Sequence, residues 1–123
     1  LADVLSDPRV EFRPGLIQDE TVVDGLLRAE GITHLVNFAA ESHNDRSLLA
    51  GSEFVSTNVL AVHRLLEATR RHGLARMVHV STDEVYGTTT DGEFTEESPL
   101  EPNTPYSAAK AGGDLQCRAH WKA

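Results

Sequence analysis

Two short motifs contain side chains that could do acid–base chemistry. The first is STDEVYG at residues 81–87, in which Asp83 and Glu84 are adjacent. Two neighbouring carboxyl groups repel each other, so their titrations separate and one can act as an acid while the other acts as a base. The residues alone leave a second interpretation open, because exposed Asp and Glu are ordinary in a solvated turn.

The second motif is YSAAK at residues 106–110, which places Tyr106 and Lys110 four positions apart. On a helix, side chains at this spacing lie on one face, about one turn from each other. A phenol ordinarily titrates near about 10, and a neighbouring ammonium favours the tyrosinate, so the pair could supply a base at neutral pH. A surface tyrosine that packs on a lysine stem is the alternative interpretation.

Composition excludes several classes of function. The chain has 123 residues, of which 40% are apolar and 24% charged, as expected for one globular domain. A net charge of −8, with no basic cluster longer than Arg70-Arg71, predicts no nucleic-acid partner. No apolar run approaches the ~20 residues that span a bilayer and no charged-then-apolar leader is present, so we expect a cytoplasmic protein without a membrane partner.

Histidine and cysteine usage gives no sign of a metal site or a disulfide. The six histidines lack ligand spacing, and Cys117 is the sole cysteine, so we expect no bound metal and a buried or idle thiol rather than a nucleophile. His79 lies in a strand pattern and is expected to be a core or edge residue whose polar atoms are satisfied.

Hydrophobic periodicity predicts alternating helices and strands. The expected elements are the end of a helix at 1–6, a short strand at 9–12, a helix from Asp19 to Gly31, a strand at 33–40 covered on both faces, a polar loop at 41–52, a helix at 53–71, a strand at 76–81, a turn at Asp91-Gly92 and a last helix after Thr104, its N-cap, and Pro105. The buried stripe of the long helix is predicted to be Val55, Val59, Val62 and Leu66.

This alternation predicts right-handed crossovers, a parallel sheet and therefore an α/β fold. In such sheets ligands bind beyond the carboxyl ends of the strands, so the loops at 39–46 and 82–87 should share one edge. The glycines nowhere give the G-x-G-x-x-G spacing of a dinucleotide-binding turn. Either no dinucleotide binds or the chain lacks its first βαβ unit, and its abrupt start favours the second interpretation.

Taken together, the motifs resemble the extended short-chain dehydrogenase/reductases and, within them, the dTDP-glucose 4,6-dehydratases. The resemblance is carried by VNFAAESHNDRS (36–47), TNVL (57–60), STDEVYG (81–87) and FTEESPLEPNTPYSAAK (94–110). It implies that residues 1–123 are a single, incomplete domain, the central part of an NAD-binding, Rossmann-like, doubly wound parallel sheet. The first βαβ unit and the C-terminal substrate domain are then missing from the chain, and the full-length enzyme is expected to be a homodimer.

The resemblance also implies roles for individual residues. The expected cofactor-binding residues are Phe38, Ala39, Ala40, Glu41, Ser42, Thr57, Tyr106 and Lys110. The expected substrate-binding residues are Ser42 and Thr82. The expected catalytic residues are Thr82, Asp83, Glu84, Tyr106 and Lys110.

The implied reaction is the NAD-dependent dehydration of dTDP-glucose to dTDP-4-keto-6-deoxyglucose, catalysed by a hydro-lyase of deoxysugar biosynthesis. Tyr106, helped by Thr82 and Lys110, would take the proton of the C4 hydroxyl while hydride passes to NAD. Glu84 would then remove the C5 proton and Asp83 would protonate the departing C6 hydroxyl, before hydride returns to C6.

Two alternatives remain open at this point. A nucleotide-sugar 4-epimerase or decarboxylase would use Tyr106 and Lys110 but not both acids, and a non-catalytic fragment would use none of these residues. The chain also departs from the family at Leu16, where the family commonly has the Asp of Gly-Asp-Ile near adenine. Leu16 predicts that adenine meets backbone or apolar groups instead.

Overall fold

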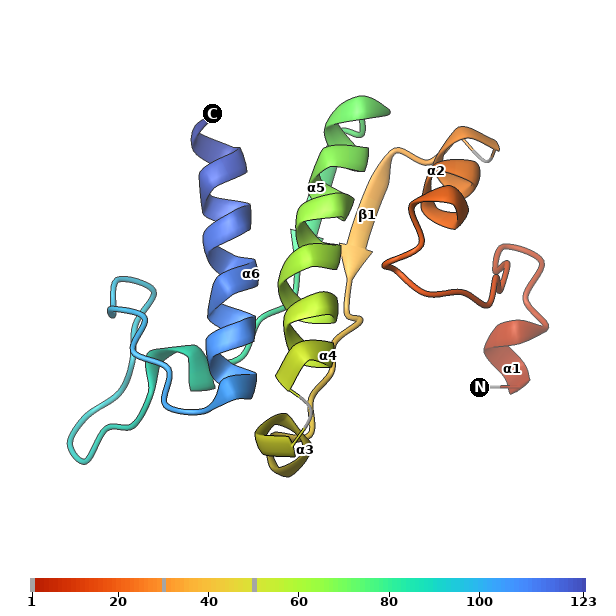
Figure 1. Ribbon diagram of the computed structural model, residues 1–123. Helices are drawn as coiled ribbons and strands as arrows, with labels where there is room; N and C mark the ends of the chain where they lie inside the picture. Colours follow the sequence, from red (N-terminus) through yellow and green to blue (C-terminus); the bar gives the residue numbers. More distant parts are fainter. Residues whose placement is uncertain (1, 30, 50) are drawn as a thin grey trace.

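The protein has a two-stranded parallel sheet with helices against one side (Figure 1). A computed structural model describes residues 2–29, 31–49 and 51–123. Strand β1 (His34–Asn37) pairs with strand β2 (Arg76–His79) so that Asn37 lies opposite His79. The predicted α/β class is confirmed, because a helical crossover joins the two parallel strands.

The remaining described elements are helices and short helical turns. They are α1 (Ala2–Leu5), α2 (Glu20–Ala29), α3 (Asn44–Leu49), α4 (Gly51–Val55), the π-helical segment η1 (Ser56–Leu60), α5 (Ala61–Arg71), the 3-10 turn η2 (Asp83–Tyr86) and α6 (Pro105–Lys122). None of the described helices combines the length and apolarity that a bilayer crossing requires.

Both strands are shorter than predicted, and Asn37 explains the end of β1. The side-chain oxygen of Asn37 accepts a 3.1 Å hydrogen bond from the backbone N–H of Ala39, as in an Asx-turn. This local bond turns the backbone out of the sheet after Asn37. The backbone N–H of Val80 still donates to the Asn37 carbonyl oxygen at 3.0 Å, so the two strands stay paired up to the point where each ends.

The long crossover helix is continuous over 51–71 but contains a π-turn that the sequence pattern does not reveal. Ala61 donates its backbone N–H to the carbonyl oxygen of Ser56, five residues earlier. The wider turn rotates the buried face, so the predicted stripe is wrong at Val55, which is 54% exposed, whereas Phe54 is fully buried.

Two further expectations need correction. Residues 9–12 form no strand, because no described segment pairs with them, and Phe12 is 70% exposed. The polar loop at 41–52 contains a helix, α3, although residue 50 lies outside the described residues. The predicted end of a helix at 1–6 and the predicted helix from Asp19 to Gly31 are present as α1 and α2, while residues 1 and 30 lie outside the described residues.

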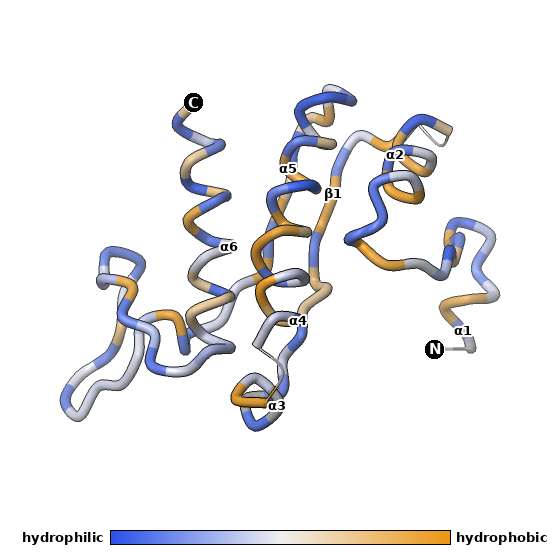
Figure 2. The backbone as a smooth tube through the Cα atoms, viewed as in Figure 1, coloured by the Kyte–Doolittle hydropathy of each residue, from blue (hydrophilic) through white to orange (hydrophobic). Residues whose placement is uncertain are grey.

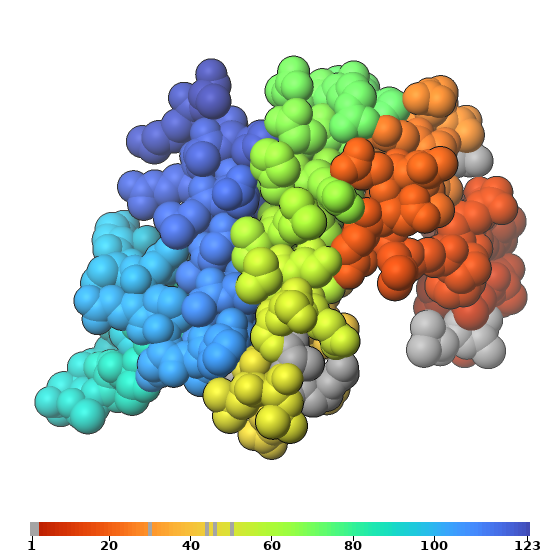
Figure 3. Space-filling model, viewed as in Figure 1, coloured from red at the N-terminus to blue at the C-terminus, as the bar shows by residue number. Residues whose placement is uncertain are grey.

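The described helices pack on one side of the sheet, and the other side is open. Val36 of β1 lies opposite Val78 of β2, and the two side chains are 55% and 46% exposed. The expectation that the first strand is covered on both faces is therefore wrong for the described residues. Helices α5 and α6 meet along their lengths on the covered side (Figure 3).

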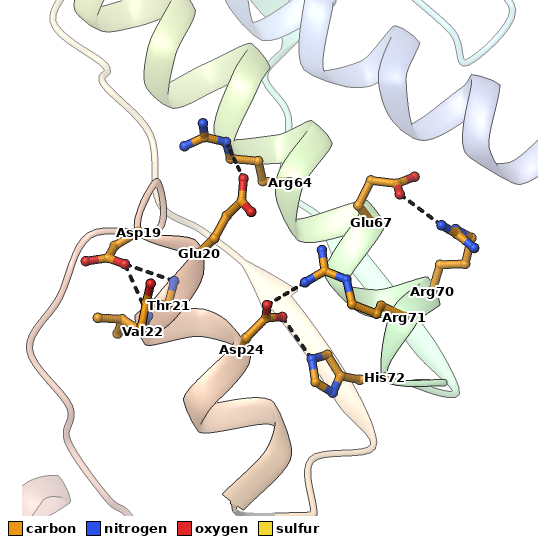
Figure 4. Close-up of polar contacts among 10 residues, drawn as sticks. All are labelled: Asp19, Glu20, Thr21, Val22, Asp24, Arg64, Glu67, Arg70, Arg71 and His72. Carbon is orange, nitrogen blue, oxygen red and sulfur yellow. Dashed lines mark hydrogen bonds and ion pairs between the residues drawn. The ribbon is translucent and has the colours of Figure 1, made fainter.

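Polar contacts dock α2 beside α5 (Figure 4). Asp24 of α2 forms ion pairs with Arg71 and, at 2.8 Å, with His72, and Arg64 of α5 lies 2.9 Å from Glu20. Such pairs are individually worth little at a surface, and here several of them connect α2 to α5 and the residue that follows it.

Helix α6 begins as predicted, at an N-cap formed by Thr104. The Thr104 hydroxyl accepts from the backbone N–H of Ser107 at 3.0 Å, and the Ser107 hydroxyl accepts from the backbone N–H of Thr104 at 3.1 Å. This capping box ends a loop that is mainly hydrophilic (Figure 2) and contains the predicted turn, in which Gly92 has a φ of 86°. The capping box fixes the start of α6, the helix from which Tyr106 and Lys110 project.

Candidate active site

The predicted site residues gather where the chain leaves the carboxyl ends of β1 and β2. Residues 38–42 follow β1, residues 80–87 follow β2, and the first turns of α6 pack against η1 and η2. The two strands end at the same level of the sheet, since Asn37, the last residue of β1, lies opposite His79, the last residue of β2. The expectation that the loops at 39–46 and 82–87 share one edge is confirmed.

Lys110 is buried and bonded to the end of β2. Lys110 is only 3% exposed, and its Nζ donates a 2.6 Å hydrogen bond to the carbonyl oxygen of Val80. Burial lowers the pKa of Lys110, while the charges of Asp114 and Cys117 act in the opposite direction. The alternative interpretation, a surface tyrosine that packs on a lysine stem, is wrong, because Tyr106 is buried as well.

Tyr106 is held by its ring rather than by its hydroxyl group. The ring meets that of Phe54 edge to face, with centroids 6.4 Å apart and planes at 82°. The phenolic oxygen has no hydrogen-bond partner among the described residues, yet it is not one of the polar atoms sealed from solvent. The side chain is therefore fixed in place with its oxygen accessible to a ligand.

Asp83 and Glu84 lie in η2, a short 3-10 turn capped by Thr82. The Thr82 hydroxyl accepts from the backbone N–H of Glu84 at 3.4 Å and lies 3.3 Å from Asp83 Oδ1, to which it donates. Val85, which is 2% exposed, anchors the turn in the core. Asp83 is exposed and Glu84 half-buried, so the two adjacent carboxyl groups have different surroundings.

Gly87 closes this turn by touching the loop that leads to α6. It has a φ of 90°, and a Cβ there would lie 2.4 Å from the carbonyl oxygen of Glu101. The backbone N–H of Glu101 also donates to the Val85 carbonyl oxygen at 3.1 Å. The acids are therefore clamped between the end of β2 and the loop before α6.

The loop after β1 is shaped by Asn58, which sequence reasoning missed. Asn58 is 1% exposed, and its side chain makes two bonds to one residue, accepting from the backbone N–H of Glu41 at 3.0 Å and donating to the Glu41 carbonyl oxygen at 2.9 Å. An asparagine inside an apolar helical segment is unfavourable unless its side chain is used, and this was the available signal.

The candidate cofactor residues of this loop differ in exposure. Phe38 is 75% exposed and Ala39 and Ser42 are also exposed, whereas Ala40 and Glu41 are half-buried. The segment thus presents small side chains and a free aromatic face at the carboxyl edge of the sheet.

Thr57 lies in the π-helical segment and is bonded to the N-terminal part of the chain. Its hydroxyl oxygen accepts a 2.7 Å hydrogen bond from Gln18 Nε2, and the Gln18 carbonyl oxygen accepts from Arg64 at 2.8 Å. Gln18, also missed from the sequence, brings the segment containing Leu16 to the same edge of the sheet. Leu16 is 69% exposed there, and an aliphatic side chain offers no hydrogen bond to a ligand.

Comparisons with known proteins agree with this arrangement. Residues 2–123 match the model of the family described as GDP-mannose 4,6 dehydratase. A dTDP-glucose 4,6-dehydratase of Streptomyces griseus is 52% identical over 120 residues, which cover 98% of this chain and 36% of that protein. The chain therefore spans little more than a third of this relative.

Solved structures show the same similarity in three dimensions. DesIV of Streptomyces venezuelae, a dTDP-glucose 4,6-dehydratase crystallised with NAD and TYD bound, superposes with a TM-score of 0.95 at 49% identity, covering 100% of this chain and 38% of that one. The UDP-Glc/GlcNAc 4-epimerase of Campylobacter jejuni, at 23% identity and a TM-score of 0.90 over 98% of this chain and 37% of its own, shares the fold.

These findings confirm the resemblance that the motifs predict. The motif at residues 94–110, which contains Tyr106, is thus no isolated coincidence of spacing, because the similarity extends over nearly the whole chain. By the match over residues 2–123, this chain belongs to the GDP-mannose 4,6 dehydratase family.

Proposed function

We propose that the protein containing this chain is an NAD-dependent dTDP-glucose 4,6-dehydratase that forms dTDP-4-keto-6-deoxyglucose. The observation that carries the proposal is the placement of Asp83 and Glu84 on a clamped turn that follows the strand end to which Lys110 is bonded. An oxidation and a dehydration need separate acid–base groups, and this edge of the sheet holds both sets.

We propose further that residues 1–123 form the central part of an NAD-binding, Rossmann-like domain. Two observations support this domain organisation. The chain covers 36% of one curated relative and 38% of one solved structure, and the sheet face bearing Val36 and Val78 is exposed among the described residues. Further strands and helices of a doubly wound sheet would cover that face.

The residues at this edge fit a dinucleotide. Small side chains at Ala39 and Ala40 allow close approach, and the Lys110 ammonium uses one donor on Val80, which leaves two for ligand oxygens. The residues proposed to hold NAD are Phe38, Ala39, Ala40, Glu41, Ser42, Thr57, Tyr106 and Lys110. When bound, NAD would supply a hydride acceptor for the sugar C4 and a hydride donor for C6.

Tyr106 is the proposed base for the C4 hydroxyl. Its accessible phenolic oxygen would accept the hydroxyl proton, and Lys110, on the same helix face, would supply a cation near the reacting oxygens. The Thr82 hydroxyl, at the end of the strand segment, orients the same sugar hydroxyl. Ser42 and Thr82 are the proposed substrate contacts of this chain.

Glu84 and Asp83 are the proposed base and acid of the dehydration. A C4 carbonyl makes the C5 proton acidic, and Glu84 removes it while the C6–oxygen bond breaks. Asp83, protonated beforehand, gives its proton to the departing hydroxyl, which leaves as water and yields a C5–C6 double bond.

A cytoplasmic homodimer is part of the proposal. NAD and nucleotide sugars are cytoplasmic metabolites, and apolar side chains are exposed on α6, where Leu115 is 51% and Trp121 89% exposed. Analytical ultracentrifugation of the full-length gene product that contains this chain tests the assembly, and a monomer at micromolar concentration contradicts it.

Incubation of that gene product with dTDP-glucose tests the function. We expect a product that has lost one water and carries a 4-keto group, with NAD recovered from the denatured protein. A product of unchanged mass with inverted C4 would identify a 4-epimerase instead, and the absence of any turnover would favour a non-catalytic role.

A further inference from the structure

Asp114 lies on α6, one turn beyond Lys110, and faces the end of β2. Its Oδ2 accepts a 2.5 Å hydrogen bond from Ser81 Oγ, and its Oδ1 lies 3.8 Å from His79 Nε2. The proposed reaction assigns no role to Asp114, Ser81 or His79. The carboxylate nevertheless contacts the segment that continues directly into Thr82.

The hydrogen bonds around His79 define which ring nitrogen carries its proton. Asn37 Oδ1 accepts from the backbone N–H of Ala39, so the amide nitrogen of Asn37 is the donor to His79 Nδ1, at 3.1 Å. The proton of the neutral imidazole is then on Nε2. Nε2 is buried without a hydrogen-bond partner among the described residues, and it faces the Asp114 carboxylate. The expectation of a fully satisfied His79 is therefore wrong.

Gly113 allows the backbone of α6 to approach His79 closely. A Cβ at Gly113 would lie 2.6 Å from the Asn58 carbonyl oxygen and 3.2 Å from His79 Nε2. The helix backbone therefore packs directly against the imidazole of His79, and the His79 side chain is only 4% exposed. Charges beside a side chain buried in this way interact more strongly than charges at an open surface.

The charge of buried Lys110 depends on its neighbours. Burial lowers the pKa of Lys110, and Asp114 and Cys117 oppose that shift. Burial raises the pKa of Cys117, so its thiol is neutral at neutral pH. The pKa of His79 is lowered by burial and by Lys110, so the imidazole is not a competing cation. Asp114 is thus the carboxylate that offsets the burial of Lys110.

We propose that Asp114 is a positioning residue that keeps the Lys110 ammonium charged and holds the segment from Ser81 to Thr82 beside it. The inference rests on the proposed function in one respect, because there Lys110 assists Tyr106 as a cation. Without the carboxylate, a buried ammonium would stand next to a buried imidazole with no counter-charge, and burial would favour the neutral amine.

The direct test measures the protonation of Lys110 without substrate. The full-length gene product is labelled at lysine Cε with 13C, and the Lys110 signal is identified by its loss in Lys110→Arg. Asp114→Asn keeps the shape and an oxygen acceptor for Ser81 but removes the charge, so the titration midpoint of Lys110 should move to lower pH. Ser81→Ala removes the hydrogen bond, keeps the charge, and should move the midpoint less. An unchanged midpoint in Asp114→Asn overturns the inference.

Turnover gives a second readout. In Asp114→Asn we expect kcat to fall about tenfold, with the alkaline limb of its pH profile moved to lower pH and KM for dTDP-glucose within about threefold. If the unsubstituted protein does not dehydrate dTDP-glucose, the proposed function fails, but the NMR midpoint still decides the role of Asp114.

A third measurement needs no variant at Asp114 and is independent of how that variant folds. 15N NMR of the unsubstituted protein should show His79 as the neutral Nε2–H tautomer at neutral pH, with the signal assigned by its loss in His79→Gln. A protonated imidazolium, or the Nδ1–H tautomer, would contradict the arrangement around Asp114.

Discussion

The Lys110 ammonium donates a 2.6 Å hydrogen bond to the carbonyl oxygen of Val80, and this bond joins α6 to the end of β2. Tyr106 projects from the same helix one turn earlier, and Asp83 and Glu84 follow Val80 within a few residues. The bond between Lys110 and Val80 therefore connects the helix that carries Tyr106 to the segment that leads to Asp83 and Glu84.

Tyr106→Phe should abolish the oxidation of C4 while preserving the fold. The phenyl ring can keep its edge-to-face packing on Phe54, but the proton-accepting oxygen is lost. We expect turnover to fall at least ~100-fold, the low end of what a positioned base contributes. Rapid mixing with dTDP-glucose should show no NADH absorbance, and circular dichroism should match the unsubstituted protein. NADH formation at the unsubstituted rate would rule out Tyr106 as the base.

Gly87→Ala should destabilise the turn that carries the acids. A Cβ there would lie 2.4 Å from the Glu101 carbonyl oxygen, and the φ of 90° is unfavourable for alanine. Urea unfolding should show a loss of at least ~1 kcal/mol in the free energy of unfolding.

Gly25→Ala is the matched control for this substitution. Its Cβ would meet no atom within 4 Å, and Gly25 lies inside α2. An alanine in a helix interior should raise stability by roughly 0.5–1 kcal/mol. Equal effects of the two substitutions would contradict the close approach of Gly87 to Glu101.

Stability should fall as the pH drops below 6.5, because of His79. Burial and then Lys110 lower the pKa of His79 from its ordinary 6.5. Between the two pKa values the unfolded chain binds a proton that the native chain does not, so the contribution present above 6.5 is lost as the pH falls through the native pKa. Denaturant midpoints across this window should fall in the unsubstituted protein and fall less in His79→Gln.

The same experiment separates His79 from the acidic groups. The hydrogen bond with His72 lowers the pKa of Asp24 from 3.8, so Asp24 contributes to acid unfolding only in a more acidic window. A stability curve that is flat between neutral pH and about 5 would contradict the buried, neutral state of His79.

Periodicity predicts the parallel α/β class, and local signals predict the start of α6, because Thr104 and Pro105 act through their immediate neighbours. Interactions between distant segments are not encoded in this way. The π-turn at Ser56–Leu60 accompanies the double hydrogen bond between Asn58 and Glu41, seventeen residues away in sequence. The helical pattern shows neither.

The candidate site follows the same rule. Motif spacing identified Tyr106 and Lys110, whereas the partners that position them were invisible in the sequence. Asp114 was missed because its contacts with Ser81 and His79 form only when α6 packs beside the end of β2. The need for glycine at position 113 is visible only once the His79 imidazole lies against the helix backbone.

The central claim is that Asp83 and Glu84 carry out the loss of water, and the most direct measurement is single-turnover analysis of Asp83→Asn and Glu84→Gln with dTDP-glucose. Both substitutions keep side-chain shape and leave Tyr106 intact. We predict that each variant still forms enzyme-bound NADH and a 4-keto hexose, but makes the 4-keto-6-deoxy product at least ~100-fold more slowly. In deuterated solvent Glu84→Gln should also suppress exchange at C5 more than Asp83→Asn does. Dehydration at the unsubstituted rate in both variants would contradict the account and leave these acids as a solvated turn.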